Sequence, residues 1–207
     1  MVSPSHAAIP GVKRRQMLAG IASLGAIALL VRPTADAAPS PAGSGTIMPA
    51  DIPAAPGAHD FDFFVGDWKT RHRQLRHRLA GDTEWLEFSG TSSTRKILAG
   101  LGNLEETAIG SPRGAYHGAA LRLYDPAART WSIYWMDSRY PGLDTPVVGR
   151  FEDGIGRFYG EETFDGKIVQ LRLQWIPVST TECRWEQAYS VDGVRWETNW
   201  SMEFTRT

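Results

Sequence analysis

A basic segment, residues 68–79, carries two side chains that could bind an anion. It reads WKTRHRQLRHRL, and a strand with period-two alternation would put His72 and Arg76 on the same side as Trp68. At the mouth of a folded domain these two side chains could bind a carboxylate through charge-assisted hydrogen bonds. The alternative interpretation is a solvated basic edge without a binding role.

Two acidic positions could supply general acid–base chemistry. Alternation puts Glu162 on an apolar face, where desolvation would raise the pKa of its carboxyl group unless a β-bulge turns it outward. Asp137 ends another inward-facing strand, and we expect it to form a salt bridge with Arg139. His72 paired with Glu162 or Asp137 would indicate an enzyme such as a lyase, an isomerase or a hydrolase. The sequence contains no G-x-S-x-G or H-E-x-x-H motif and no glycine-rich phosphate loop.

The segment 183–204 predicts a hairpin with one aromatic face. Both residues of Asp192-Gly193 tolerate the positive φ of a two-residue turn. Pairing outward from this turn makes the following cross-strand partners: Tyr189 with Trp196, Gln187 with Thr198, Trp185 with Trp200, and Cys183 with Met202. The other face is polar and charged, so this sheet would have one dry and one wet side.

Two further hairpins extend the same pattern. A turn at Asp165-Gly166 would set Phe158, Gly160 and Glu162 beside Leu173, Leu171 and Val169. A turn around Asp125-Pro126 would send Leu121, Leu123, Trp131, Ile133 and Trp135 inward. With segments 67–79, 83–98, 103–109 and 147–153, the sequence predicts about ten antiparallel strands. Closure into an up-and-down β-barrel would remove the sheet edges, and a two-sheet sandwich is the alternative.

The eight tryptophans of the chain need an explanation, and the predicted interior receives most of them. They either pack as a core or line a cavity for a small apolar or aromatic ligand, with Gln187 and Thr198 as polar groups inside it. The predicted ligand-binding residues are Trp68, His72, Arg76, Trp131, Trp135, Glu162, Trp185, Gln187, Tyr189, Trp196, Thr198 and Trp200.

The N-terminal region predicts export. Residues 1–37 combine Lys13-Arg14-Arg15, a weakly apolar run over 17–31 and a small-x-small site at 35–37. This pattern resembles a twin-arginine signal and implies the translocase and signal peptidase as partners, with an ordinary secretory signal as the alternative. The run is too short for a stable membrane anchor. Residues 38–59 form a Pro/Ala-rich linker and 60–207 the barrel domain, located in the periplasm or outside the cell.

The totals exclude other classes. The chain has 207 residues and a formal charge of −1, so no strongly basic surface predicts nucleic-acid binding. Its one cysteine, Cys183, cannot form an internal disulfide and is expected to be an inert core thiol.

The stretch FFVGDW places Gly66-Asp67-Trp68 just before the first strand. This G-x-W, with ALRLYDPAARTWSIYWMD and RWEQAYSVDGVRWETNW, resembles the calycin barrels, the lipocalins and their relatives, in an exported bacterial form. The resemblance implies that Gly66 and Trp68 close one end of the barrel. Nitrobindin-like haem barrels are similar in strand number, but their haem ligand is a histidine near the C-terminus, and no histidine follows His117. We therefore predict no cofactor, with haem as the alternative.

Overall fold

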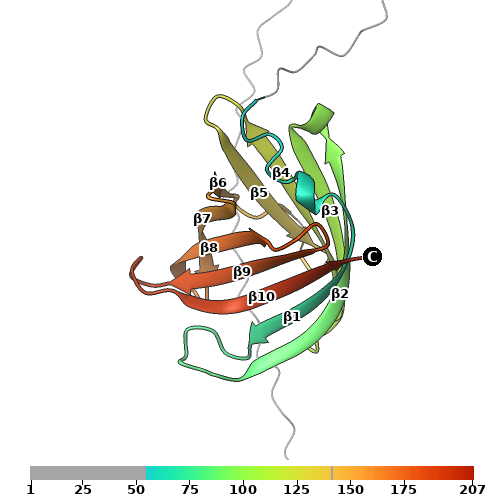
Figure 1. Ribbon diagram of the computed structural model, residues 1–207. Coiled ribbons are helices and arrows are strands. Elements are labelled where there is room, and N and C mark those ends of the chain that lie inside the picture. Colours follow the sequence, from blue (N-terminus) through green and yellow to red (C-terminus); the bar gives the residue numbers. More distant parts are fainter. Residues whose placement is uncertain (1–54, 141) are drawn as a thin grey trace, which may run out of the picture. The chain divides into compact units, whose positions relative to one another are not determined.

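The computed structural model describes residues 55–140 and 142–207, which form a closed antiparallel β-barrel (Figure 1). The predicted signal peptide and most of the linker lie outside the described residues. The ten strands are β1 (Gly66–Leu75), β2 (Trp85–Ile97), β3 (Gly102–Ile109), β4 (Tyr116–Asp125), β5 (Thr130–Asp137), β6 (Val147–Glu152), β7 (Ile155–Phe164), β8 (Lys167–Pro177), β9 (Glu182–Ser190) and β10 (Glu197–Arg206). Two 3₁₀ helices accompany them, η1 (Asp62–Phe64) and η2 (Leu98–Gly100).

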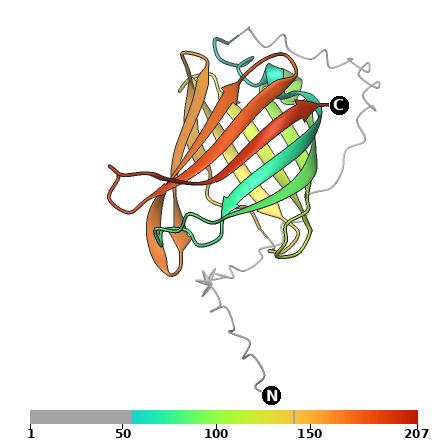
Figure 2. The ribbon, with the colours of Figure 1, turned by 60° about the horizontal axis from the view of Figure 1, so that its bottom comes forward.

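Each strand pairs with its neighbours in sequence, and β1 pairs with β10 to close the barrel (Figure 2). The up-and-down barrel is therefore confirmed, and the sandwich alternative is wrong. No helix in the described part of the chain is long and apolar enough to cross a membrane.

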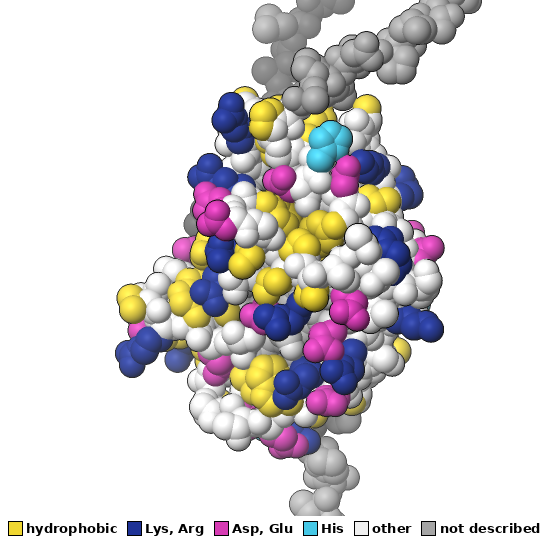
Figure 3. Space-filling model, in the orientation of Figure 1, with side chains coloured by type: hydrophobic (Ala, Val, Ile, Leu, Met, Phe, Trp, Pro, Cys, Tyr) yellow, Lys and Arg dark blue, Asp and Glu magenta, His cyan; other side chains and the backbone are white. Residues whose placement is uncertain are grey.

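Period-two alternation decides which side chains face the lumen. In β1, Trp68, Thr70 and His72 are buried, while Lys69 and Arg71 are exposed. On the side shown in Figure 3, basic and acidic side chains are interspersed with uncharged ones, and a group of hydrophobic side chains lies in the middle. The β7–β8 hairpin has the predicted register, including Glu162 opposite Val169, because Asp165 and Gly166 adopt the positive φ values that a two-residue turn needs.

The predicted register of the β9–β10 hairpin is wrong. The Asp192 carboxylate accepts hydrogen bonds from the backbone N–H groups of Val194 and Arg195 at 2.9 and 2.8 Å, which widens the connection beyond two residues. The register also shifts between Thr198 and Trp200. The observed partners are Tyr189 with Glu197, Ala188 with Thr198, Gln187 with Trp200, Trp185 with Met202 and Cys183 with Phe204.

This shift moves two residues of the predicted site out of the lumen. Trp196 packs on the outer face, with its ring centroid 6.2 Å from that of Tyr159 and 4.8 Å from the Arg172 guanidinium carbon. Thr198 pairs with Ala188, which alternates with the inward-facing Gln187 and Tyr189, so it also belongs to the outer face.

The predicted facing of β4 is also wrong, although that of β5 is right. Ala120, Arg122 and Tyr124 face inward opposite the predicted Trp135, Ile133 and Trp131, while Leu121 and Leu123 face outward. Arg122 is only 1 % exposed. Its buried charge is tolerated because Glu105 on β3 pairs with the guanidinium and Asn103 Oδ1 accepts a further hydrogen bond at 2.9 Å. A paired charge can occupy a core position where sequence patterning expects an apolar residue.

Residues 61–68 close one end of the barrel, as the G-x-W motif predicts. Trp68 Nε1 donates to the Phe64 carbonyl at 2.9 Å, and the Arg206 guanidinium lies 4.3 Å from the Trp68 ring. Arg206 also donates to the Val65 and Phe63 carbonyls, both at 2.8 Å. The aromatic side chains that fill this closed end are each at most 2 % exposed: Phe61, Phe64, Trp68, Trp131, Phe158, Trp175 and Phe204.

Candidate functional site

The opposite end of the barrel, the mouth, is where polar and aromatic side chains converge. Its central residue is Arg78, in the loop between β1 and β2. Arg78 Nη1 donates to Tyr189 Oη at 3.0 Å. Its guanidinium carbon lies 6.0, 5.5 and 5.8 Å from the ring centroids of Phe164, Tyr189 and Trp200. A cation over aromatic faces is attracted to their π-systems, so the rings hold Arg78 across the mouth.

Tyr189 connects Arg78 to a carboxyl group. Its hydroxyl donates to Glu162 Oε2 at 2.7 Å. Burial raises the pKa of Glu162, while the hydrogen bond from Tyr189 and the charge of Arg78 oppose that shift. The direction agrees with the prediction from alternation. Burial also raises the pKa of Tyr189, so the phenol stays protonated and available as a donor.

His72 lies in the lumen wall and is fully buried. Its ring stacks on Phe88 at a centroid distance of 4.7 Å. Trp200 Nε1 donates to His72 Nδ1 at 3.3 Å, so the proton of a neutral imidazole is on Nε2, which donates to Thr70 Oγ1 at 2.9 Å. Burial lowers the pKa of His72 to about 4. At neutral pH this side chain is therefore an uncharged support for the Trp200 indole.

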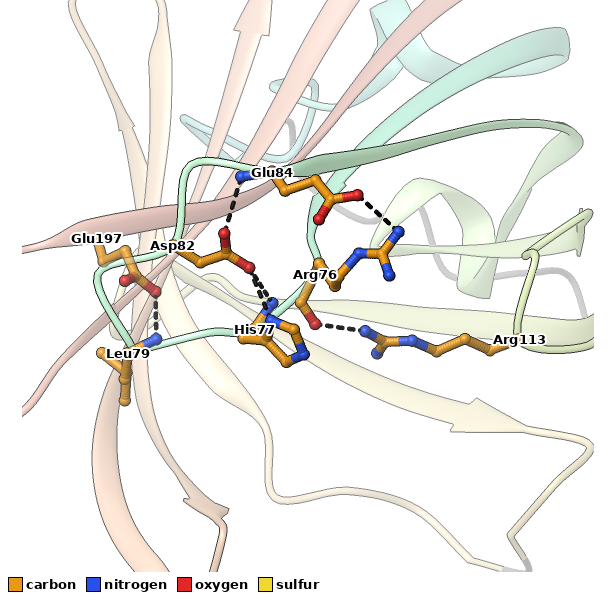
Figure 4. Close-up of polar contacts among 7 residues, drawn as sticks. All are labelled: Arg76, His77, Leu79, Asp82, Glu84, Arg113 and Glu197. Carbon is orange, nitrogen blue, oxygen red and sulfur yellow. Dashed lines mark hydrogen bonds and ion pairs between the residues drawn. The ribbon is translucent and has the colours of Figure 1, made fainter. Parts of the chain in front are cut away.

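The loop that carries Arg78 is braced on both sides (Figure 4). Asp82 accepts hydrogen bonds from the His77 backbone N–H, the His77 ring and the Glu84 backbone N–H, at 3.0, 2.8 and 3.0 Å. Leu79, which has a positive φ, donates its backbone N–H to Glu197 at 2.7 Å. Arg76 points to the outer side and pairs with Glu84 at 2.6 Å, so it does not share the lumen with His72 as the alternation predicted.

A second arginine lies over the mouth from the loop after β5. Arg139 forms the predicted salt bridge with Asp137, through Nε at 3.0 Å and Nη2 at 2.7 Å, and its guanidinium covers the Tyr116 ring at 3.6 Å. The hydrogen bond from Arg139 lowers the pKa of Asp137. Arg139 is therefore neutralised by its own partner. Among residues 55–140 and 142–207, Arg78 has no carboxylate oxygen within the 4.0 Å of an ion pair.

The lumen wall below the mouth contains apolar side chains that are only partly buried. Several side chains that face inward by strand register remain partly accessible, in contrast to the closed end: Trp135, Leu171, Leu173, Trp200 and Met202. Gly118 leaves room for an indole, since a Cβ at this position would lie 2.4 Å from Trp135. Two shallow hollows of about 390 and 440 Å³ lie over β1 to β4, and they share Thr91, Ala108 and His117.

The predicted site residues separate into three groups. Glu162, Tyr189, Trp200 and His72 are brought together near the mouth, and Trp135, Trp185 and Gln187 line the lumen. Trp68 and Trp131 belong to the packed closed end. Arg76, Trp196 and Thr198 lie outside.

Sequence reasoning missed two important arginines. Arg78 follows the last residue of β1, Leu75, so strand alternation says nothing about its direction. Arg122 and Glu105 are opposite charges on neighbouring predicted strands, and that pairing was the available signal for a buried ion pair.

Comparison with known proteins supports the fold alone. The crystal structure of Rv2717c from M. tuberculosis is similar to this chain with a TM-score of 0.51 and 11 % sequence identity, over 74 % of this chain and 98 % of that one. No protein-family model matches the chain, and no curated protein matches it by sequence.

Proposed function

We propose that this protein is an exported calycin-like barrel that binds a small apolar or aromatic molecule in its lumen. The observation that carries the proposal is the partial exposure of inward-facing apolar side chains below the mouth, such as Leu171 and Met202. An eight-strand barrel is about filled by its own side chains, whereas ten strands enclose a wider lumen. The proposal of export depends on the N-terminal sequence, with its paired Arg14-Arg15.

The geometry favours binding over the acid–base alternative. His72 is bonded to Thr70 and Trp200, Glu162 to Tyr189, and Asp137 to Arg139, so each candidate acid or base is occupied by a different neighbour. The haem alternative is disfavoured by the same contacts. His72 is the histidine among the described residues that faces the lumen, and both of its ring nitrogens already have hydrogen-bond partners.

The test is calorimetric titration of the purified protein with neutral aromatic probes, beginning with 2-naphthalenemethanol. The variant Leu171→Trp should weaken binding about tenfold or more, because the larger side chain occupies the free part of the lumen. The matched control is Ile168→Trp on the same strand, since Ile168 is 71 % exposed on the outer face. The control should bind as the wild type does.

Two results would contradict the proposal. One is the absence of binding by the wild type with every neutral aromatic probe. The other is a Leu171→Trp variant that binds normally, because the probe would then be held elsewhere. If the lumen is already packed, Leu171→Trp should also lower the free energy of unfolding by about 1–3 kcal/mol, because overpacking a full core is destabilising.

A further inference from the structure

We propose that the molecule bound in the lumen carries a carboxylate, and that Arg78 binds this group at the barrel mouth. The inference depends on the proposed function, because it names the chemical class of ligand for the same site. It starts from the guanidinium of Arg78, which is placed over the lumen without a counter-charge in contact.

The hydrogen bonds of Arg78 leave most of its capacity unused. A guanidinium has five N–H donors in a planar fork. In the described chain, Arg78 gives one hydrogen bond, from Nη1 to Tyr189 Oη. The remaining donors are suited to a carboxylate, which an arginine binds with two parallel hydrogen bonds.

Three other arginines that cover aromatic rings at the two barrel ends have charged or carbonyl partners in the protein, although Arg122 Nε is buried without a hydrogen-bond partner. Arg122 has Glu105 and Asn103, and Arg139 has Asp137. Arg206 donates to three backbone carbonyls. Arg78 differs from these three because its hydrogen-bond partner is a neutral hydroxyl, although its loop is held in place by the hydrogen bonds of Asp82 and Leu79 (Figure 4).

The surroundings of Arg78 fit an amphipathic acid. On the lumen side its guanidinium faces the rings of Phe164, Tyr189 and Trp200, which suit an aromatic or apolar ligand body. Glu162 is the nearby carboxyl group, and the Tyr189 hydroxyl separates it from Arg78. Burial raises the pKa of Glu162, and the hydrogen bond from Tyr189 and the charge of Arg78 oppose that shift.

The experiment compares two probes that share one ring system, 2-naphthoate and 2-naphthalenemethanol, by calorimetry at pH 7. The wild type should bind the carboxylate about 10- to 100-fold more tightly than the alcohol, as expected for hydrogen bonds to a charged group. Arg78→Gln should remove this preference while changing the affinity for the alcohol less than about threefold.

Two variants serve as controls. Arg76→Gln removes a charge from the same loop, but this side chain is paired with Glu84 away from the lumen, so the preference should stay. Glu162→Gln removes the nearby carboxyl group and should bind 2-naphthoate at least as tightly as the wild type. Thermal unfolding of each variant checks that it is folded.

The outcomes separate this inference from the proposed function. Equal affinity of the wild type for both probes overturns the carboxylate inference and leaves lumen binding intact. A preference that survives Arg78→Gln, or one that is lost equally in Arg76→Gln, removes the assignment to Arg78. If neither probe binds, the proposed function fails, and the inference fails with it.

Discussion

The two ends of the barrel each place an arginine over three aromatic rings, but the two arginines differ in their partners. At the closed end, Arg122 lies 4.9–5.1 Å from the rings of Phe61, Phe64 and Trp175. At the mouth, Arg78 lies over Phe164, Tyr189 and Trp200. Arg122 is almost fully buried and paired with Glu105, whereas Arg78 is partly exposed and contacts a neutral hydroxyl.

This difference suggests different roles for the two arginines: Arg122 stabilises the closed end, and we propose that Arg78 binds a ligand. A charge removed from water must be paired inside the protein, because an unpaired buried ion is very unfavourable. The closed end meets that condition because Glu105 pairs with the charge of Arg122 inside the protein. At the mouth, Arg78 is partly exposed and forms no ion pair within the described residues, so a ligand could supply an acceptor there.

The largest expected effect comes from removing the carboxylate at the closed end. Glu105→Ala should destabilise the protein by about 3–5 kcal/mol, because it leaves the Arg122 charge buried and unpaired. Glu162→Ala at the mouth should cost only about 1 kcal/mol, since it removes one hydrogen bond at a partly exposed position. The measurement is urea unfolding followed by tryptophan fluorescence.

The double variant Glu105→Gln with Arg122→Met is the control for this pair. It removes both charges together and should recover most of the stability, because the cost lies in the unpaired ion. Similar losses for Glu105→Ala and Glu162→Ala would show that the two ends are equivalent, and the comparison would then be wrong.

The second expected effect is a pH dependence of the free energy of unfolding. It tests whether the lumen is still shielded from water at His72. Folded His72 has a pKa of about 4, below its value of 6.5 in the unfolded chain. Between these values the unfolded chain binds more protons than the folded protein does. The contribution of neutral His72 to the free energy of unfolding is therefore complete above pH 6.5 and is lost as the pH falls toward 4. The loss should reach about 3 kcal/mol.

His72→Gln is the control for this titration. Its unfolding free energy should change less between pH 6.5 and 4 than that of the wild type. Glu162 has the opposite sign, because its raised pKa gives a contribution that is present at low pH and lost as the pH rises through the folded-state value. If the free energy of unfolding changes equally with pH in the wild type and in His72→Gln, water reaches the imidazole. The part of the lumen shielded from water would then not include His72.

Most of the barrel could be predicted from the sequence because alternation and turn residues agree along most strands. Asp165-Gly166 gave the correct register of β7 and β8. The β9–β10 register failed because side-chain capping by Asp192 widened the turn and a bulge followed near Asn199. Neither the wider turn nor the bulge can be detected from the alternation of apolar and polar residues.

The site was predicted only where it lies on regular strands. Glu162 and Tyr189 were placed correctly on the inner face, and they do meet. The alternation of β1 ends at Leu75, so it predicted that Arg76 faces the lumen, whereas Arg76 pairs with Glu84 and Arg78 contacts the lumen rings. Loop geometry, set here by Asp82 and its partners, decides which arginine turns inward.

The smallest expected effect concerns the uncharged hydrogen-bond partner of each arginine. Tyr189→Phe removes the hydroxyl that joins Arg78 to Glu162, and it should cost about 1 kcal/mol, because both groups remain close enough to solvent to find new partners. Asn103→Ala removes the amide that accepts from Arg122, and it should cost about 1.5–3 kcal/mol, since that guanidinium has no access to water. Both values come from urea unfolding at pH 7. If Tyr189→Phe costs more than Asn103→Ala, the mouth depends on its internal network more strongly than the closed end does, and Arg78 is then a structural residue whose acceptor the protein already provides.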